Sequence, residues 1–235
     1  MVFTSNRGEN TVGVFNQGKD HGLQKIKVGG RPNGLAFDHS RNRLLAANVP
    51  KQNSRDPVTV SIVDVATKTM IADVTVPGRT RWAVFDPETK RFYVNIADPS
   101  EIAILDSEDP DGLAGSYRIP SAGPHGLDFD RRGRRLFCAC DAGQLYKINL
   151  ESNKISEPSK LAGPPDVIFY NPELDHLYVT IGDPAIIQVF DTNTMREIQT
   201  VTTEPGTHTI AFNQHTGNVY AFMPETHRAS VYEEE

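Results

Sequence analysis

The sequence predicts an all-β fold, a β-propeller of four-stranded blades, because one short pattern recurs along the whole chain. In each copy an apolar strand ends at an aromatic anchor, a turn with Asp or Asn follows, and a second strand begins. The anchors recur every 40 to 48 residues, close to the period of a propeller blade. The helical period of about 3.6 residues is essentially absent. The anchors are Phe37, Phe85, Phe129, Phe169 and Phe212.

The strands of one repeat follow from its turn residues. The Asp or Asn after each anchor suits a turn, since its side chain can accept a hydrogen bond from the backbone just ahead. A third strand such as TVSIVD (59–64) again ends in Asp, and a weaker outer strand such as MIADVTV (70–76) leads into a link rich in Pro and Gly. Each full repeat is therefore expected to form one blade.

The two ends of the chain hold partial repeats. Residues 1–29 match the second, third and fourth strands of a blade, and residues 209–234 match a first, second and third strand. Four complete and two partial repeats predict six blades, or seven if the N-terminus is shortened. We expect a single propeller domain over residues 1–235, because all-β chains of this length commonly fold as one unit.

Charge and composition limit which binding partners and which cellular compartment are expected. The net charge of −6 argues against general binding to nucleic acid or anionic membranes, which needs an excess of Lys and Arg. No apolar run approaches the ~20 residues that span a bilayer, and the start of the chain lacks the pattern of a signal peptide. We expect a cytoplasmic protein as the chain stands, or a periplasmic or secreted one if an N-terminal signal has been removed. Cys138 and Cys140 are expected to be buried packing residues.

The repeats resemble those of the YVTN-repeat (YncE-like) β-propeller family. The likeness rests on Asn-containing strand ends, a TVSVID-like third strand and a link of the type V-G-x-x-P-x-G. The segments that carry it are FTSNRGENTVGVFN (3–16), VGGRPNGLAFD (28–38), RFYVNIAD (91–98) and LYVTIGDPAIIQVFDTNT (177–194). The resemblance covers nearly the whole chain and implies a propeller used for binding or as a scaffold. Sugar-lactone hydrolases and a streptogramin lyase have similar blades.

Polar residues at equivalent positions of the repeats indicate a candidate site. The first strand of a blade lines the propeller channel, and the link before it is expected to lie at the same end as the turn between the second and third strands. The positions four residues before the anchors are Asn33, Arg81, His125, Pro165 and His208. The neighbouring turns add Asn6, Arg7, Glu9, Asn48, Asp98, Asp141 and Asp183. A mouth with converging polar groups is the usual place for a ligand.

The chemistry of this set leaves more than one interpretation open. His125 and His208 are suitable ligands for a divalent cation, with carboxylates and water completing the shell. Alternatively, Arg81 with the protonated imidazoles can clamp a carboxylate or phosphate. A histidine at a wet channel mouth also often bonds only to water and nearby backbone. The sequence thus predicts a small polar or anionic ligand, with or without a divalent metal ion.

Two other functions remain alternatives. A lactonase-like hydrolase or lyase would use a bound metal to polarise a carbonyl, with a free histidine as the general base. Whether the protein is an enzyme stays open, and its catalytic residues stay unassigned, because the sequence has no GxSxG, HExxH, P-loop or CxxC motif. The other alternative is a non-catalytic scaffold that binds a protein or polyanion through basic turns such as Arg131–Arg135 on the opposite face. The insertion at 48–57 is a lid over the mouth or a tolerant surface loop.

Overall fold

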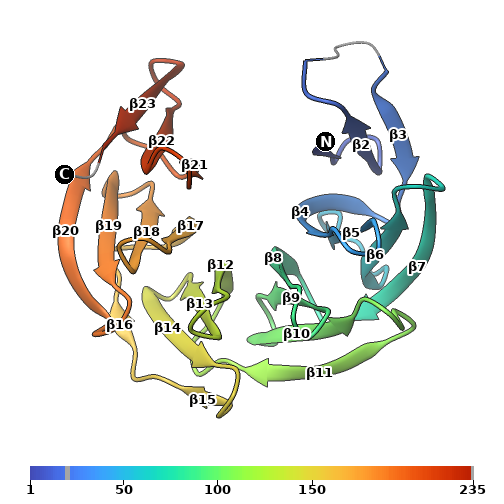
Figure 1. Ribbon diagram of the computed structural model, residues 1–235, viewed down its shortest axis with the longest axis horizontal. Helices are drawn as coiled ribbons and strands as arrows, with labels where there is room; N and C mark the ends of the chain where they lie inside the picture. Colours follow the sequence, from blue (N-terminus) through green and yellow to red (C-terminus); the bar gives the residue numbers. More distant parts are fainter. Residues whose placement is uncertain (19–21, 234–235) are drawn as a thin grey trace. The chain divides into compact units, whose positions relative to one another are not determined.

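The computed structural model describes residues 1–18 and 22–233 and shows an all-β protein. These residues form 23 strands and no helix (Figure 1). The strands make six antiparallel sheets, the blades of a β-propeller fold, as the sequence predicts. The chain divides into two compact units, Met1–Pro120 and Ser121–Glu235. The expectation of a single domain over 1–235 stays a prediction.

The first unit contains one three-stranded and two four-stranded sheets. The first sheet is β1 (Val2–Asn6), β2 (Thr11–Phe15) and β3 (Gln24–Lys27). The second is β4 (Arg31–Asp38), β5 (Arg43–Val49), β6 (Val58–Asp64) and β7 (Thr69–Val76). The third is β8 (Thr80–Asp86), β9 (Arg91–Ile96), β10 (Glu101–Asp106) and β11 (Leu113–Arg118). Strands β1 and β2 pack against β4 in the way that β5 and β6 pack against β8, so β1 occupies the second position of its blade.

The second unit contains one sheet each of five, four and three strands. The first is β12 (Pro124–Asp130), β13 (Arg135–Cys140), β14 (Gln144–Asn149), β15 (Lys154–Ile155) and β16 (Ser159–Lys160). The second is β17 (Pro165–Asn171), β18 (His176–Ile181), β19 (Ile186–Asp191) and β20 (Arg196–Thr202). The third is β21 (Ile210–Asn213), β22 (Asn218–Met223) and β23 (Arg228–Tyr232).

The outer strand of one blade is broken into two short pieces. Both β15 and β16 pair with β14, where the sequence predicts one continuous fourth strand. Pro158 lies between them and has no backbone N–H to donate to β14. The ladder is therefore interrupted at this residue and resumes after it.

The core of each unit lies between neighbouring sheets and is filled by their middle strands. In the first unit Phe92 is fully buried, and its ring lies 4.8 Å from that of Phe85, centroid to centroid. In the second unit Phe137 and Phe190 fill the corresponding space. Cys138 and Cys140 are not joined in a disulfide and are fully buried, as their place in an apolar strand suggests.

The turns after the anchor residues use Asp as predicted. The side-chain Oδ1 of Asp130 accepts hydrogen bonds from the backbone N–H groups of Arg132 (3.0 Å) and Gly133 (2.9 Å). Asp38 does the same for Ser40. These turns then close through a residue of positive φ. Those residues are Asn42, Lys90, Arg134 and Asp175.

Candidate functional site

The link into each first strand packs against the turn between the second and third strands of the same blade. A β-carbon at Gly163 would lie 2.4 Å from the carbonyl oxygen of Asp183, and one at Gly78 would lie 1.7 Å from that of Asp98. Only glycine tolerates such close backbone approach. Within a blade, the start of the first strand and this turn therefore share one end, which is the end where the sequence places the candidate site.

Four side chains of the second unit form a continuous chain of carboxylate and imidazole groups. Nδ1 of His125 lies 2.7 Å from Oδ1 of Asp141, and its Nε2 lies 3.2 Å from Oδ1 of Asp166. The other oxygen of Asp166, Oδ2, lies 3.0 Å from Nδ1 of His208. We call this set the His–Asp cluster: Asp141, His125, Asp166 and His208.

The two histidines of the His–Asp cluster differ in exposure. The His125 side chain is 13% exposed, whereas that of His208 is 57% exposed. Because both nitrogens of His125 face carboxylate oxygens, only the imidazolium form donates both hydrogen bonds at once. Thr209 Oγ1 also lies 3.2 Å from Nδ1 of His208, so that nitrogen is held from two sides. The imidazole of His208 is thus fixed on one nitrogen and exposed to solvent.

Asp166 is the member of the cluster that the sequence analysis missed. Counting back from Phe169 selects Pro165, but the pairing of Asn171 with His176 matches that of Asp130 with Arg135. Tyr170 is therefore the true anchor of this repeat, and the equivalent of His125 is Asp166. Both β12 and β17 change register at this point, which turns the side chain out of the regular alternation. Aligning the repeats on the Asp or Asn of the turn would have found it.

The predicted site residues of the first unit have their own contacts. Asn33, in β4, accepts a hydrogen bond from Arg7 on its side chain and one from Ser5 Oγ (2.6 Å) on its carbonyl oxygen. Arg81, in β8, is partly exposed, and its carbonyl oxygen lies next to Gly34. That Asn33 and Arg81 share one mouth with the histidines stays a prediction.

The remaining predicted residues lie apart from the His–Asp cluster. Asp183 is exposed in the turn between β18 and β19, outside that chain of contacts. Asn48 is buried at the end of β5 in the first unit. Among residues 1–18 and 22–233, no group of at least three His, Cys, Asp or Glu side chains has a metal-binding arrangement. A metal on His125 would have to replace one of its carboxylate contacts.

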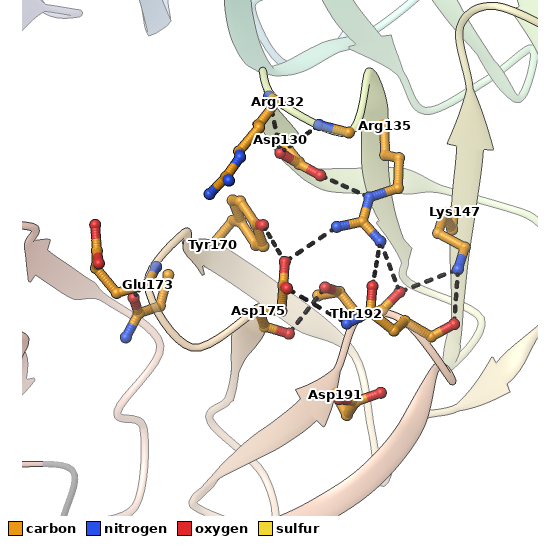
Figure 2. Close-up of polar contacts among 12 residues, drawn as sticks. Asp130, Arg132, Arg135, Lys147, Tyr170, Glu173, Asp175, Asp191 and Thr192 are labelled. Atoms are coloured by element: carbon orange, nitrogen blue, oxygen red, sulfur yellow. Dashed lines mark hydrogen bonds and ion pairs between the residues drawn. The ribbon is translucent and has the colours of Figure 1, made fainter.

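In the second unit, Arg135 contacts three turns, which contain Asp130, Asp175 and Thr192 (Figure 2). Its Nε donates to Asp130 Oδ2 (2.6 Å), and its Nη2 donates to Asp175 Oδ1 (3.2 Å). Tyr170 donates its hydroxyl to the same oxygen of Asp175 at 2.6 Å. That hydrogen bond is the main reason that the pKa of Asp175 is lowered, with Arg135 adding to it. Arg135 thus belongs to an internal network, whereas Arg131 and Arg132 are exposed.

The basic turns of the first unit are also paired with acids. Arg41 and Lys90 both donate to the carboxylate of Glu108, and Arg43 donates to the carbonyl oxygen of Ser107. The hydrogen bonds from Lys90 and Arg41 lower the pKa of Glu108. Much of the positive charge that the sequence offers to a polyanion is therefore already balanced within the unit.

A partly buried carboxylate connects two first strands of the second unit. Asp128, in β12, accepts hydrogen bonds from the backbone N–H groups of Phe129 (2.8 Å) and Tyr170 (2.6 Å). Burial raises the pKa of Asp128 to about 6, against the effect of both hydrogen bonds. Asp128 was not among the predicted site residues, because an Asp within an apolar strand gives no sign of its partner.

Comparison with known proteins supports the assignment of the fold. No family model and no curated protein matches this sequence. Among solved structures, the chain is similar to Kuenenia stuttgartiensis hydrazine synthase, with a TM-score of 0.66 and 13% identity. The match covers 99% of this chain and 92% of that one. At this identity the similarity supports a shared β-propeller fold and carries nothing about activity.

Proposed function

We propose that this β-propeller binds a small polar ligand at the His–Asp cluster of its second unit. The observation that carries the proposal is the unbroken chain from Asp141 through His125 and Asp166 to His208. Clusters of close titratable groups concentrate at functional sites. The repeat sequence further supports assigning the chain to the YVTN type of propeller.

The charges of the cluster indicate the kind of ligand. Asp141 and Asp166 contribute two carboxylates, and His125 as an imidazolium balances one of them. Both carboxylates are about one-third exposed, so their remaining lone pairs can accept hydrogen bonds from a ligand. The exposed ring of His208 adds a third contact. We therefore expect ligands rich in hydroxyl or amino donors rather than phosphates.

Titration of the histidine ring signals tests this proposal. Glycerol, glucose and ethanolamine serve as donor probes, and inorganic phosphate serves as the anionic probe. Saturable shifts of the His125 ring by a donor probe, lost in His208→Ala and kept in the control His215→Ala, would support the site. His215 is a suitable control because it is an exposed histidine in the turn between β21 and β22. Shifts caused by phosphate alone, or unchanged in His208→Ala, would contradict it.

A hydrolase or lyase is the second candidate, because Asp166 orients His208 as a carboxylate orients a general base. The contact between Asp166 Oδ2 and His208 Nδ1 is 3.0 Å. A carboxylate in this position sets the tautomer and the orientation of a catalytic imidazole. In a panel of lactones, Asp166→Asn should then lower kcat/KM by roughly 10²-fold or more. Equal rates for the variant and the wild type would exclude this role.

The metal hypothesis needs its own measurement. We propose elemental analysis of the dialysed protein, with the double variant His125→Ala, His208→Ala beside the wild type. Stoichiometric metal that disappears in the variant would support metal binding by these histidines. Metal retained equally in both proteins would place it elsewhere.

A further inference from the structure

The first unit contains a small cavity between one long turn and the strands beside it. It has a volume of about 130 Å³ and lies beneath the loop that joins β5 to β6. This loop spans residues 50–57, whereas the equivalent turns are residues 97–100, 141–143 and 182–185. The insertion supplies one wall of the cavity through Lys51, Ser54 and Asp56, and β5 supplies another through Asn48.

Asn48 is a polar residue at a position that three other blades fill with apolar ones and the first sheet fills with Asn6. It pairs with Pro32 at the end of the second strand and is 2% exposed. By the same pairing, its equivalents are Ile96, Cys140 and Ile181, which are all fully buried. Burial of an amide costs free energy unless its groups are hydrogen-bonded. Packing alone therefore does not account for an amide at this position.

The hydrogen bonds around Asn48 fix the direction of its amide. Ser61 Oγ donates its proton to Asp73 Oδ1 (2.8 Å), because an ionised carboxylate can only accept. Ser61 Oγ must then accept from its other neighbours, which are the N–H of Gly29 (3.0 Å) and Nδ2 of Asn48 (2.9 Å). Nδ2 of Asn48 also donates to Thr59 Oγ1 (3.0 Å). If the amide were rotated by 180°, Oδ1 of Asn48 would face Ser61 Oγ, which needs a donor at that place.

With this orientation, Oδ1 of Asn48 is a buried acceptor without a hydrogen bond from the described residues. Buried polar atoms nearly always have a partner, so the natural partner is a donor inside the cavity. The charged residues that line the same cavity are Arg31, Lys51 and Asp56. Arg31 is held beside the loop by its hydrogen bond from Nη1 to the carbonyl oxygen of Pro50 (3.3 Å).

We propose that this cavity binds a small carboxylate that carries a hydroxyl or ammonium group beside it. The hydroxyl or ammonium donates to Oδ1 of Asn48, and the carboxylate faces the positive charges of Arg31 and Lys51. A cavity of about 150 Å³ holds benzene, so 130 Å³ allows a ligand of roughly six non-hydrogen atoms. Glycolate and glycine fit this description. The site is distinct from the His–Asp cluster and does not depend on the function proposed for it.

Backbone NMR of the ¹⁵N-labelled protein tests the proposal with named probes. Glycolate and glycine are titrated to tens of millimolar, with acetate and ethylene glycol as controls that lack the donor and the carboxylate respectively. We expect saturable shifts in residues 50–57 with glycolate or glycine, and at least about tenfold weaker effects with both controls. Whichever of the two probes binds more tightly identifies the donor as hydroxyl or ammonium.

Two variants link the shifts to the cavity. Asn48→Leu places at this position an apolar side chain like those of Ile96 and Ile181, so it should fold and lose binding. Lys51→Gln should weaken binding about tenfold, while Arg55→Gln, in the same loop but not lining the cavity, should leave it unchanged. Equal binding of acetate, retained binding in Asn48→Leu, or no shift with any probe would each overturn the proposal. The absence of any shift would mean that only water donates a hydrogen bond to Oδ1 of Asn48.

Discussion

At the scale of single residues, Asp128 shows how the partial burial of a charge can act against stability. Its carboxylate accepts two backbone N–H groups, one of them from the neighbouring sheet. Even so, burial raises its pKa from the usual 3.8 to about 6. The folded protein therefore binds this proton more tightly than the unfolded chain does. The stability gained from this group is complete below about pH 4 and is lost as the pH rises through about 6.

Asp128→Asn should remove that dependence on pH. The amide oxygen can still accept one of the two hydrogen bonds, and it carries no charge to desolvate. Relative to wild type, we expect the free energy of unfolding of the variant to increase between pH 4.5 and 7, by roughly 3 kcal/mol at most. Urea denaturation of both proteins at pH 4.5 and at pH 7 measures this difference in the free energy of unfolding. A difference that stays constant with pH would show that the Asp128 carboxylate does not titrate in this range.

Tyr170→Phe should destabilise the second unit through Asp175. The hydroxyl of Tyr170 donates to this carboxylate at 2.6 Å, and a hydrogen bond to a charged group contributes roughly 1.5–3 kcal/mol. Because the pKa of Asp175 is lowered, its contribution is present at neutral pH and is lost as the pH falls below the ordinary Asp range. Denaturation at pH 7 should show the loss, and Tyr146→Phe is the control outside this network. An equal effect of both variants would contradict the role of Asp175.

At the scale of elements, the contact between link and turn depends on glycine. A β-carbon at Gly163 would meet the carbonyl oxygen of Asp183 at 2.4 Å and the Cγ2 atom of Ile181 at 3.0 Å. Gly163→Ala should therefore cost roughly 1–3 kcal/mol through overpacking. Gly8→Ala, where nothing lies within 4 Å, is the control and should change stability little. Thermal unfolding of both variants measures the difference, and equal Tm values would show that the backbone yields without cost.

The strands were predictable from sequence, whereas their irregularities were not. Alternating apolar residues and Asp turns mark β12 and β17 clearly, since both depend on local chemistry. Two adjacent aromatic residues, Phe169 and Tyr170, made the anchor of one repeat ambiguous. A shift of one residue exchanges the faces of a strand, so Pro165 was selected in place of Asp166. His125 and His208 were found because their repeats contain no such ambiguity.

Contacts in the candidate sites between residues far apart in the chain also could not be predicted from the sequence. The contact between Asp166 and His208 joins β17 to the link before β21, and neither local sequence encodes it. Likewise, the insertion at 48–57 was predicted to be a lid or a surface loop, but the cavity beneath it and the hydrogen bonds that orient Asn48 were not predictable. Contacts between residues far apart in the sequence decide both features.

At the scale of the whole molecule, two sheets have three strands, so a strand that is paired on both sides in the other blades lies at an edge in each of them. In the described chain, β1 pairs only with β2, and β23 pairs only with β22. Exposed edge strands are templates for association between chains. Val231, in β23, is 51% exposed and adds an apolar side chain to such an edge.

Val231→Lys should therefore reduce self-association. A lysine on an edge strand places charge where a second chain would pair. Light scattering over a range of concentrations should show a lower apparent mass for the variant than for the wild type. Lysine at Phe222, which is 49% exposed in β22, the middle strand of the same sheet, is the matched control. A reduction of the same size in Phe222→Lys would indicate a general effect of charge.

The packing of link against turn also bears on how such a chain can change over time. The buried middle strands fill the core, while the residues of the His–Asp cluster and of the Asn48 cavity come from links, strand ends and turns at one end of their own blades. The blade with the longest of these turns has a cavity beside it, and its four-stranded sheet is intact. New chemistry can therefore arise one blade at a time, with the cost confined to a few residues and the inherited core unchanged.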